Sequence, residues 1–256
     1  MIFDSHMHTE FSSDSRMKIQ EVIEKANNLN IGVVLTEHLD LAYPEKDEFR
    51  VNPKDYFTAY NKYRNDKLLL GIEIGLSLSV NKENSIIANS NPFDFIIGSI
   101  HAVNDEDIYL TYGKEGVTKD EYFKTYLEYM LKCIQDYKDF DALGHIDYPC
   151  RYCPFDNKEL IYNEKADILD EVFKSLIDNG KVMEINTARI DNKESFMNLV
   201  TIYTRYRELG GKYITIGSDA HNQNNIGRNF NEAFNFLDIT GLKGIYYKER
   251  KPEFIK

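Results

Sequence analysis

Seven short apolar runs recur along this chain, and a longer stretch separates each run from the next. Several of those stretches carry apolar residues at the three- and four-residue spacing of an amphipathic helix. Strand and helix patterns that alternate from end to end are typical of βα units built on a parallel sheet. The predicted strands are Ile2–His6, Val33–His38, Leu68–Gly75, Phe95–His101, Asp141–Ile146, Val182–Thr187 and Tyr213–Asp219.

Four of the intervening helices have recognisable ends. One is predicted over Met17–Asn30, and another follows the capping box Thr118–Glu121. Two more are predicted over Glu164–Asn179 and Glu194–Leu209, and glycines follow both of them. The chain therefore reads as an α/β fold.

Two connections are predicted to be irregular. Residues 76–92 are polar and rich in asparagine, and residues 104–117 hold Tyr109 and Tyr112 among acidic residues and glycines. Loops at the carboxyl ends of parallel strands usually shape the pocket, so both are candidate lids. The sequence contains no internal repeat and no linker rich in proline or glycine, and we interpret residues 1–256 as one domain.

Composition limits the class of partner. The formal net charge of −11 argues against a nucleic-acid surface, which needs clustered lysine and arginine, while a small phosphorylated metabolite remains compatible with a local cationic site. No segment has the length and apolar content of a membrane span or of a signal peptide. Three cysteines form no disulfide framework, so we expect a cytoplasmic protein, with formation of a homo-oligomer left open.

Histidines mark the ends of the predicted strands. All six stand at or just past the end of an apolar run, namely His6, His8, His38, His101, His145 and His221. His6 and His8 alternate as on a strand, which turns both rings toward one face. Two carboxylates, Glu73 and Asp219, end further strands, and Asp14 lies in the first loop.

These nine side chains are candidate metal ligands. All of them offer nitrogen or oxygen, which suits zinc, manganese or iron better than a metal that prefers thiolate. Nine donors are too many for one ion but suit two or three divalent ions with three to four protein ligands each. Taken alone, Asp14 is the weaker candidate ligand, because the Ser-Ser-Asp-Ser segment could also be a turn or a helix cap.

These segments resemble the polymerase and histidinol phosphatase (PHP) superfamily, most closely its histidinol-phosphatases. The resemblance covers almost the whole chain. It is carried by Asp4–Thr9 with Phe11–Asp14, Thr36–His38, Gly71–Glu73, Phe93–His101, Leu143–His145, Glu184–Ala188, and Gly217–His221 with Ile226–Arg228.

The resemblance implies a distorted (β/α)7 barrel of the TIM-like type with a trinuclear metal site. One ion would take His6, His8, Glu73 and Asp219; the second would share Glu73 and add His101 and His145; the third would use Asp14, His38 and His221. Some relatives have histidine at the position of Asp14, so the ligands of the third ion differ within the family.

The implied reaction is hydrolysis of L-histidinol phosphate to L-histidinol and phosphate, a step of histidine biosynthesis. A water acidified by two cations would attack phosphorus in line, with Glu73, Asp219 and His221 as catalytic residues. Arg189, Arg228 and Asn186 are the predicted substrate-binding residues, since guanidinium suits a phosphate.

Several residues keep more than one interpretation. Arg16 and Arg151 lie in rim loops and rank below the other arginines, because an exposed arginine is more often a solvated charge. Glu184 could orient a ligand histidine, meet a substrate amine, or be a buried structural carboxylate. Cys150 and Cys153 have the spacing of half a zinc knuckle and are interpreted as incidental thiols.

Three alternatives remain open from the sequence. A PHP phosphoesterase could act on phosphotyrosine or a nucleotide phosphate, although the missing basic surface disfavours a polymerase-associated exonuclease. A His-x-His amidohydrolase would commonly bridge its metals with a modified lysine, whereas this chain offers Glu73. A metal-binding or regulatory module without turnover is disfavoured by the complete ligand set.

Overall fold

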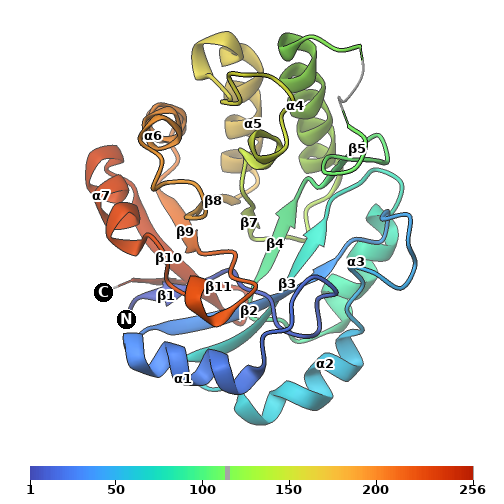
Figure 1. The fold of residues 1–256 in the computed structure, drawn as a ribbon, viewed down its shortest axis with the longest axis vertical. Helices are drawn as coiled ribbons and strands as arrows, with labels where there is room; N and C mark the ends of the chain where they lie inside the picture. The colour runs from blue at the N-terminus through green and yellow to red at the C-terminus, as the bar shows by residue number, and fades with distance from the viewer. Residues whose placement is uncertain (113–115, 256) are drawn as a thin grey trace.

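The computed structural model describes residues 1–112 and 116–255 and contains the seven predicted parallel strands. They follow one another around the sheet in chain order (Figure 1). Their bounds are β1 Phe3–Asp4, β2 Gly32–Leu39, β3 Leu68–Gly75, β4 Ile96–Ser99, β7 Ala142–Leu143, β8 Val182–Asn186 and β9 Tyr213–Gly217. Six of them lie within the predicted ranges, and β2 extends one residue beyond its predicted range at each end.

The seven strands close into a barrel between β1 and β9. The backbone N–H of Ser5 donates to the carbonyl of Ile216 at 2.8 Å, and the N–H of Asp219 donates to the carbonyl of His6 at 2.8 Å. Met7 and Ala220 form a parallel bridge just beyond these bonds. The short strands β1 and β7 distort the barrel, and the predicted (β/α)7 fold is confirmed.

Seven α-helices surround the barrel in the described residues (Figure 1). The four predicted ones are confirmed, and the capping box of Thr118 and Glu121 is formed. The helices are α1 Ile19–Leu29, α2 Pro53–Tyr60, α3 Asn81–Ser90, α4 Lys119–Asp136, α5 Ala166–Asp178, α6 Lys193–Glu208 and α7 Phe230–Thr240. None of the helices that the structure describes is long and apolar enough to cross a membrane.

The two connections predicted to be irregular differ in outcome. Residues 76–92 contain helix α3, so the prediction of an irregular loop is wrong there; the buried Asn84 holds the chain by donating to the carbonyl of Gly75 at 3.1 Å. The segment 104–117 contains the turn and the second strand of a small hairpin formed by β5 Ala102–Val103 and β6 Glu106–Asp107. Its residues 113–115 lie outside the described part of the chain.

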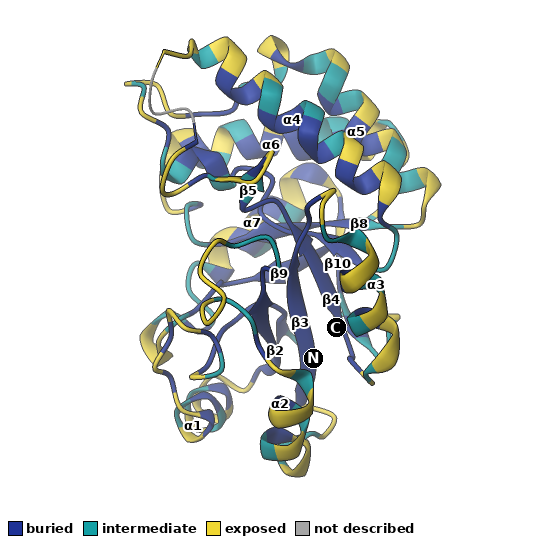
Figure 2. Cartoon of the chain, turned by 90° about the vertical axis from the view of Figure 1, so that its right-hand side faces the viewer, coloured by how far each residue is buried: buried dark blue, intermediate teal, exposed yellow. Residues whose placement is uncertain are grey.

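Alternation along the strands builds two apolar layers. On β2 and β3, Val34 and Leu69 point into the barrel, whereas Leu35 and Leu70 point toward the helices. Figure 2 shows the strands buried along their length and the helices exposed on one face only. Burial of each such side chain stabilises the fold by about 1.5–3 kcal/mol.

A C-terminal hairpin of β10 Lys243–Lys248 and β11 Lys251–Phe254, absent from the predicted elements, covers the amino end of the barrel. Tyr247 packs in the inner apolar layer, its ring stacked 5.2 Å from that of Phe95. The guanidinium of Arg250 binds the carboxylate of Asp141, which precedes β7. The amino end of the barrel is therefore filled by protein, and the carboxyl end is left for a site.

Candidate metal centre

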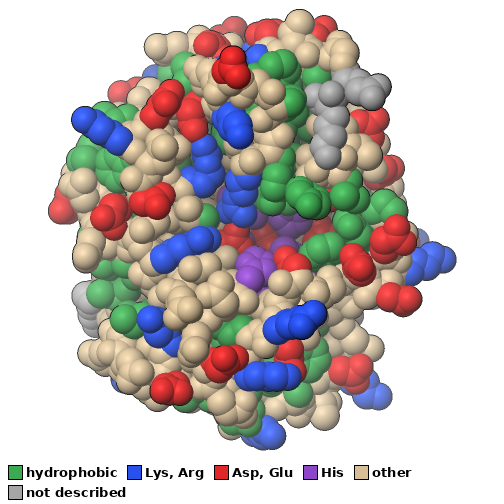
Figure 3. All heavy atoms as spheres, viewed as in Figure 1, with side chains coloured by type: hydrophobic (Ala, Val, Ile, Leu, Met, Phe, Trp, Pro, Cys, Tyr) green, Lys and Arg blue, Asp and Glu red, His purple; other side chains and the backbone are tan. Residues whose placement is uncertain are grey.

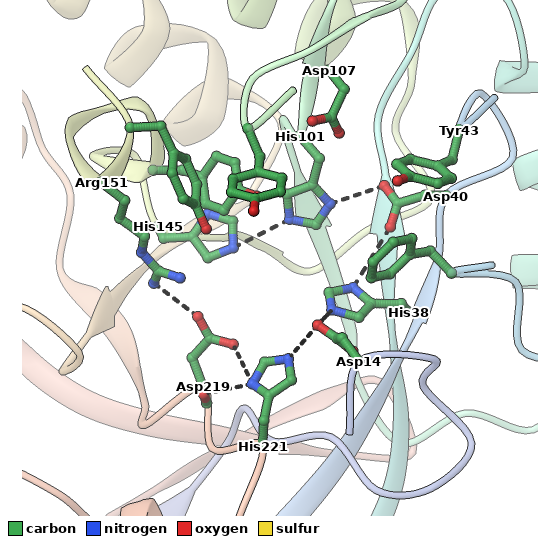
Figure 4. A pocket seen from close by; sticks show the side chains of 14 residues that line it. Asp14, His38, Asp40, Tyr43, His101, Asp107, His145, Arg151, Asp219 and His221 are labelled. Carbon is green, nitrogen blue, oxygen red and sulfur yellow. Dashed lines mark hydrogen bonds and ion pairs between the residues drawn. The ribbon is translucent and has the colours of Figure 1, made fainter. Parts of the chain in front are cut away.

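The nine predicted ligands meet at the carboxyl end of the barrel, and six of them line the cavity drawn in Figure 4. Strand alternation delivers most of them, because side chains two residues apart share a face of a strand. Asp219, just past β9, has a φ of 54°, a left-handed conformation that aspartate tolerates better than most residues. This turn in the chain brings its carboxylate toward His6 and His8.

The first donor group consists of His6, His8, Glu73 and Asp219. The Nε2 atoms of His6 and His8 lie 3.0 Å apart. Oε2 of Glu73 lies 3.4 and 3.5 Å from these two nitrogens, and Oδ1 of Asp219 lies 3.7 and 3.4 Å from them. Donors of a tetrahedral zinc site at 2.0–2.1 Å lie about 3.3 Å from one another, so the spacing suits one ion.

The second donor group is built around the other oxygen of Glu73. Oε1 of Glu73 lies 3.0 Å from Nε2 of His145 and 3.4 Å from Nε2 of His101. The two imidazole nitrogens are 3.4 Å apart. Glu73 thus places one oxygen in each of two adjacent donor groups, which is the arrangement expected of a bridging carboxylate.

The third group lies nearer to solvent. Oδ2 of Asp14 is 2.9 Å from Nε2 of His221 and 3.5 Å from Nε2 of His38 (Figure 4). The side chain of Asp14 is 36% exposed, so this group keeps more access to water than the buried Glu73. His8 also lies with His38 and His221, so the donor groups adjoin one another.

An unpartnered atom indicates that a cation belongs here. Within the described part of the chain, Oε2 of Glu73 is fully buried and makes no hydrogen bond, although Nδ1 of His38 lies 3.0 Å from it and is likewise without one. A buried carboxylate oxygen without a partner is costly unless an ion or water satisfies it. Together with the nitrogen and oxygen donors and their spacing, this atom makes the site fit divalent transition metals.

Glu184 and Ser99 hold the ligands in place. Oε1 of Glu184 lies 2.6 Å from Nδ1 of His6, and Oε2 accepts the backbone N–H of His145 at 3.0 Å. The hydroxyl of Ser99 donates to Oε1 of Glu73 at 2.6 Å. Of the interpretations open for Glu184, the structure supports the one in which it orients a ligand histidine.

Asp40 is a residue of the site that the sequence analysis missed. Its Oδ1 lies 2.9 Å from Nδ1 of His101, which leaves Nε2 directed at the second donor group. Gly75 makes room for it, since a Cβ there would lie 1.8 Å from Oδ1 of Asp40. The signal was present, because Asp40 stands two residues after His38 and so shares its face of the chain.

Charge balance within the site is set by burial and by the mixture of ligands. Burial opposes the charged form of His6, yet the carboxylates of Glu184, Glu73 and Asp219 raise its pKa well above the usual value. Burial and the neighbouring His38 and His221 lower the pKa of His8 well below it. Burial would favour a neutral Glu73, but the surrounding histidines hold its pKa well below the usual range.

A cavity of about 260 Å³ opens above the donor groups. Figure 3 shows histidine side chains at the bottom of a central hollow, with hydrophobic side chains along one border and lysine and arginine on the other. Besides ligands, the cavity is lined by Asp40, Tyr43, Phe49, Asp107, Tyr109, Tyr148, Arg151 and Tyr152. Of the two candidate lids, the segment 104–117 contributes to this lining through Asp107 and Tyr109.

The arginine that reaches the cavity is Arg151, which the sequence analysis ranked low. Its Nη2 lies 2.8 Å from Oδ2 of Asp219 and donates to Oδ1 of Asn186 at 3.2 Å. Asn186 also donates to Oδ2 of Asp219 at 3.3 Å. Asn186 therefore supports Arg151 and Asp219 at the border of the cavity.

The two arginines predicted to bind substrate lie elsewhere. Arg189 forms ion pairs with Asp147 and Glu159, and Arg228 donates from Nε to the carbonyl of Ser218 at 2.9 Å. Neither lines the cavity above the donor groups. Asp147 and Glu159 stand 42 and 30 residues before Arg189, so the sequence alone could not reveal that they occupy its guanidinium.

The three cysteines are buried thiols. Cys133, Cys150 and Cys153 are free of disulfides, and burial raises the pKa of Cys133 to about 12. The candidate metal groups found among the described residues contain histidine and carboxylate side chains only. This agrees with the interpretation of Cys150 and Cys153 as incidental.

Comparisons with known proteins agree with this geometry. The model of the PHP domain family matches residues 4–188. A probable histidinol-phosphatase of Clostridium acetobutylicum is 43% identical over 254 residues, which cover 99% of this chain and 100% of that protein. A histidinol-phosphatase of Lactococcus lactis is 32% identical over 230 residues, with 85% of this chain and 83% of that protein covered.

A solved structure matches the fold as a whole. The crystal structure of histidinol phosphate phosphatase from Lactococcus lactis, complexed with zinc, L-histidinol and phosphate, has a TM-score of 0.89 and 28% identity, with 98% of each chain covered. One conclusion follows from the strand-end ligands, the closed seven-stranded barrel and the family match. This chain belongs to the PHP domain family.

Proposed function

We propose that this chain is a metal-dependent phosphomonoesterase that hydrolyses L-histidinol phosphate to L-histidinol and phosphate. The observation that carries the proposal is the position of Glu73, whose two oxygens serve two adjacent donor groups under a cavity of small-molecule size. The names of the relatives, and the zinc, histidinol and phosphate bound to the Lactococcus lactis protein, support the choice of substrate. The proposal treats residues 1–256 as one catalytic domain.

The residues assigned to two or three divalent ions are those of the three donor groups. Zinc is favoured by the related structure, while manganese and iron accept the same nitrogen and oxygen donors. When bound, such ions polarise phosphoryl oxygens and lower the pKa of a water molecule to near neutrality. The proposed reaction uses no cysteine thiol, because the three cysteines are buried and lie outside these donor groups.

The side chains of the chain itself prepare the site for metal cations on one side and for a phosphoryl anion on the other. Glu73 and Asp219 place negative charge between the histidines, and His221 stands with Asp14 at the more exposed group. Arg151 lines the cavity beside Asp219 and offers a planar guanidinium to a phosphoryl oxygen. We therefore assign phosphate binding to Arg151, with Asn186 positioning it, and not to Arg189 or Arg228.

The proposed partner is a small phosphorylated metabolite. A cavity of about 260 Å³ holds a compound the size of an amino alcohol phosphate. The net charge of −11 disfavours nucleic acid, and the cytoplasmic location remains a prediction from the sequence.

One assay tests the proposal. Purified protein is loaded with zinc, manganese or iron, and its metal content is measured by elemental analysis. Phosphate release is then compared for L-histidinol phosphate, phosphotyrosine and a nucleoside monophosphate. Hydrolysis of an ester or amide substrate of amidohydrolases is measured separately by release of its carboxylic acid. The highest kcat/KM is expected for L-histidinol phosphate with two or more metal equivalents bound. A preference for another compound would overturn the substrate assignment, and metal-free activity would overturn the mechanism.

A further inference from the structure

The cavity above the metal ligands has two chemically different ends. The ligands and Arg151 form an end suited to an oxyanion, whereas Asp107 and Tyr43 form a wall on another side of the cavity (Figure 4). The inference drawn from this wall rests on the proposed function and concerns the part of the substrate that is not the phosphate.

Asp107 supplies the carboxylate of that wall. It ends strand β6, where it pairs with Ala102, and the next residue donates its N–H to the carbonyl of His101 at 2.9 Å. Oδ1 of Asp107 accepts the N–H of Leu110 at 2.8 Å. The hairpin thus fixes Asp107 relative to the metal ligand His101 and leaves it half-buried at the cavity.

Three other buried carboxylates of the chain are each paired with an arginine. Asp219 pairs with Arg151, Asp147 with Arg189 and Asp141 with Arg250. In residues 1–112 and 116–255, no lysine or arginine forms an ion pair with Asp107. A carboxylate that is partly withdrawn from water and lacks a cationic partner favours a cation supplied by a ligand.

Aromatic rings surround the same space. The ring of Tyr148 lies 4.9 Å from that of His101, and the guanidinium carbon of Arg151 already lies over the Tyr148 ring, 5.4 Å from the ring centroid. On the other side of the cavity, Tyr43 packs 4.7 Å from Phe49. The faces of such rings attract an ammonium or imidazolium group and exclude water from it.

We propose that Asp107, with the ring of Tyr43, binds a cationic nitrogen group of the phosphorylated substrate. The substrate class is then a small phosphomonoester whose organic part carries an ammonium or imidazolium group. The phosphate would face the donor groups and Arg151, while the cation would face Asp107, so the cavity orients the molecule from both ends.

The test compares two phosphomonoesters that differ in this charge, 2-aminoethyl phosphate and ethyl phosphate. For the metal-loaded enzyme we expect a higher kcat/KM with the amine. In Asp107→Asn, which keeps an oxygen for the N–H of Leu110, the ratio of the two kcat/KM values should fall about 10- to 100-fold. The exposed neighbour Glu106 provides the control, because Glu106→Gln should leave the ratio unchanged.

A second variant keeps the inference testable if Asp107→Asn fails to fold. Tyr43→Leu removes a ring without changing the hairpin and should lower the same ratio by a smaller factor. An unchanged ratio in both variants, or equal kcat/KM values for the two compounds with the unmodified enzyme, would overturn the inference. Failure of the proposed function looks different, since the unmodified enzyme would then release phosphate from neither compound nor from L-histidinol phosphate.

Discussion

Oε1 of Glu184 lies 2.6 Å from Nδ1 of His6, and its other oxygen holds the backbone of His145. One buried carboxylate therefore fixes ligands of both inner donor groups. In Glu184→Gln we expect metal affinity to fall about 10- to 100-fold, because the amide orients His6 less well and does not raise its basicity. Competition with a chromogenic chelator measures the affinity, and Glu194→Gln on the exposed face of α6 is the control. Equal affinities would contradict this role.

Glu73 contributes one oxygen to each of two donor groups, so its replacement should weaken metal binding at both. Glu73→Ala is expected to lower bound metal by more than one equivalent and to reduce kcat/KM at least 1,000-fold, on the order of 4 kcal/mol in transition-state stabilisation. His8→Ala should remove metal and activity together. Elemental analysis with steady-state kinetics checks both variants, and turnover close to the unmodified rate in either would contradict the ligand assignment.

Arg151 and Arg189 should behave differently when shortened to alanine. Arg151→Ala is expected to raise KM about tenfold or more, since it removes a charged partner of the phosphate. Arg189→Ala should leave KM unchanged and lower the free energy of unfolding by about 1–3 kcal/mol, because Asp147 and Glu159 lose their cation. Kinetics and denaturant unfolding of the two variants separate these roles, and the reverse pattern would restore Arg189 to the pocket.

Metal removal should affect stability as well as activity. Carboxylates and imidazoles with no ion between them leave buried polar atoms without partners, among them Oε2 of Glu73. We expect a chelator to abolish phosphate release and to lower the melting temperature, and added zinc or manganese to restore both. Calorimetry before and after chelation measures the shift. An unchanged melting temperature in fully stripped protein would argue against a structural contribution of the ions.

The ion pair of Arg250 and Asp141 gives a pH dependence with a definite sign. Burial raises the pKa of Asp141, and Arg250 counters that rise. A carboxylate with a raised folded-state pKa loses stability as the pH rises from the unfolded pKa through the folded one. Without the cation in Arg250→Gln this loss grows, so the free energy of unfolding should fall by about 1–3 kcal/mol at pH 7 and by less near pH 4.

Urea unfolding at the two pH values measures this difference. Lys251→Gln, on the exposed start of β11, is the control and should show no such dependence. A penalty in Arg250→Gln that is equal at both pH values would show that the pair contributes through packing and not through charge.

The strands and metal ligands could be predicted because their signals are local. A buried strand such as β3 is a continuous apolar run, and a ligand at its end needs only the two-residue alternation to find its face. Glu73 and the histidines follow directly from that rule.

The walls of the cavity could not be predicted in the same way. Arg151, Tyr148 and Asp107 lie in loops or in a very short strand, and their directions depend on contacts made across the barrel. Helix α3 was missed because its asparagine-rich sequence has low helix propensity, which the buried Asn84 and Ala88 offset by packing. Asp40, two residues after His38, could have been found by the rule that located Glu73.

The hairpin of β10 and β11 at the base of the barrel has a consequence for how such a protein changes over time. Because the hairpin closes the amino end of the barrel, reactant and products enter and leave through the carboxyl end. Selection for heat resistance can then act on the hairpin while the rim loops diversify, so that robustness and substrate choice evolve on separate ends of one scaffold.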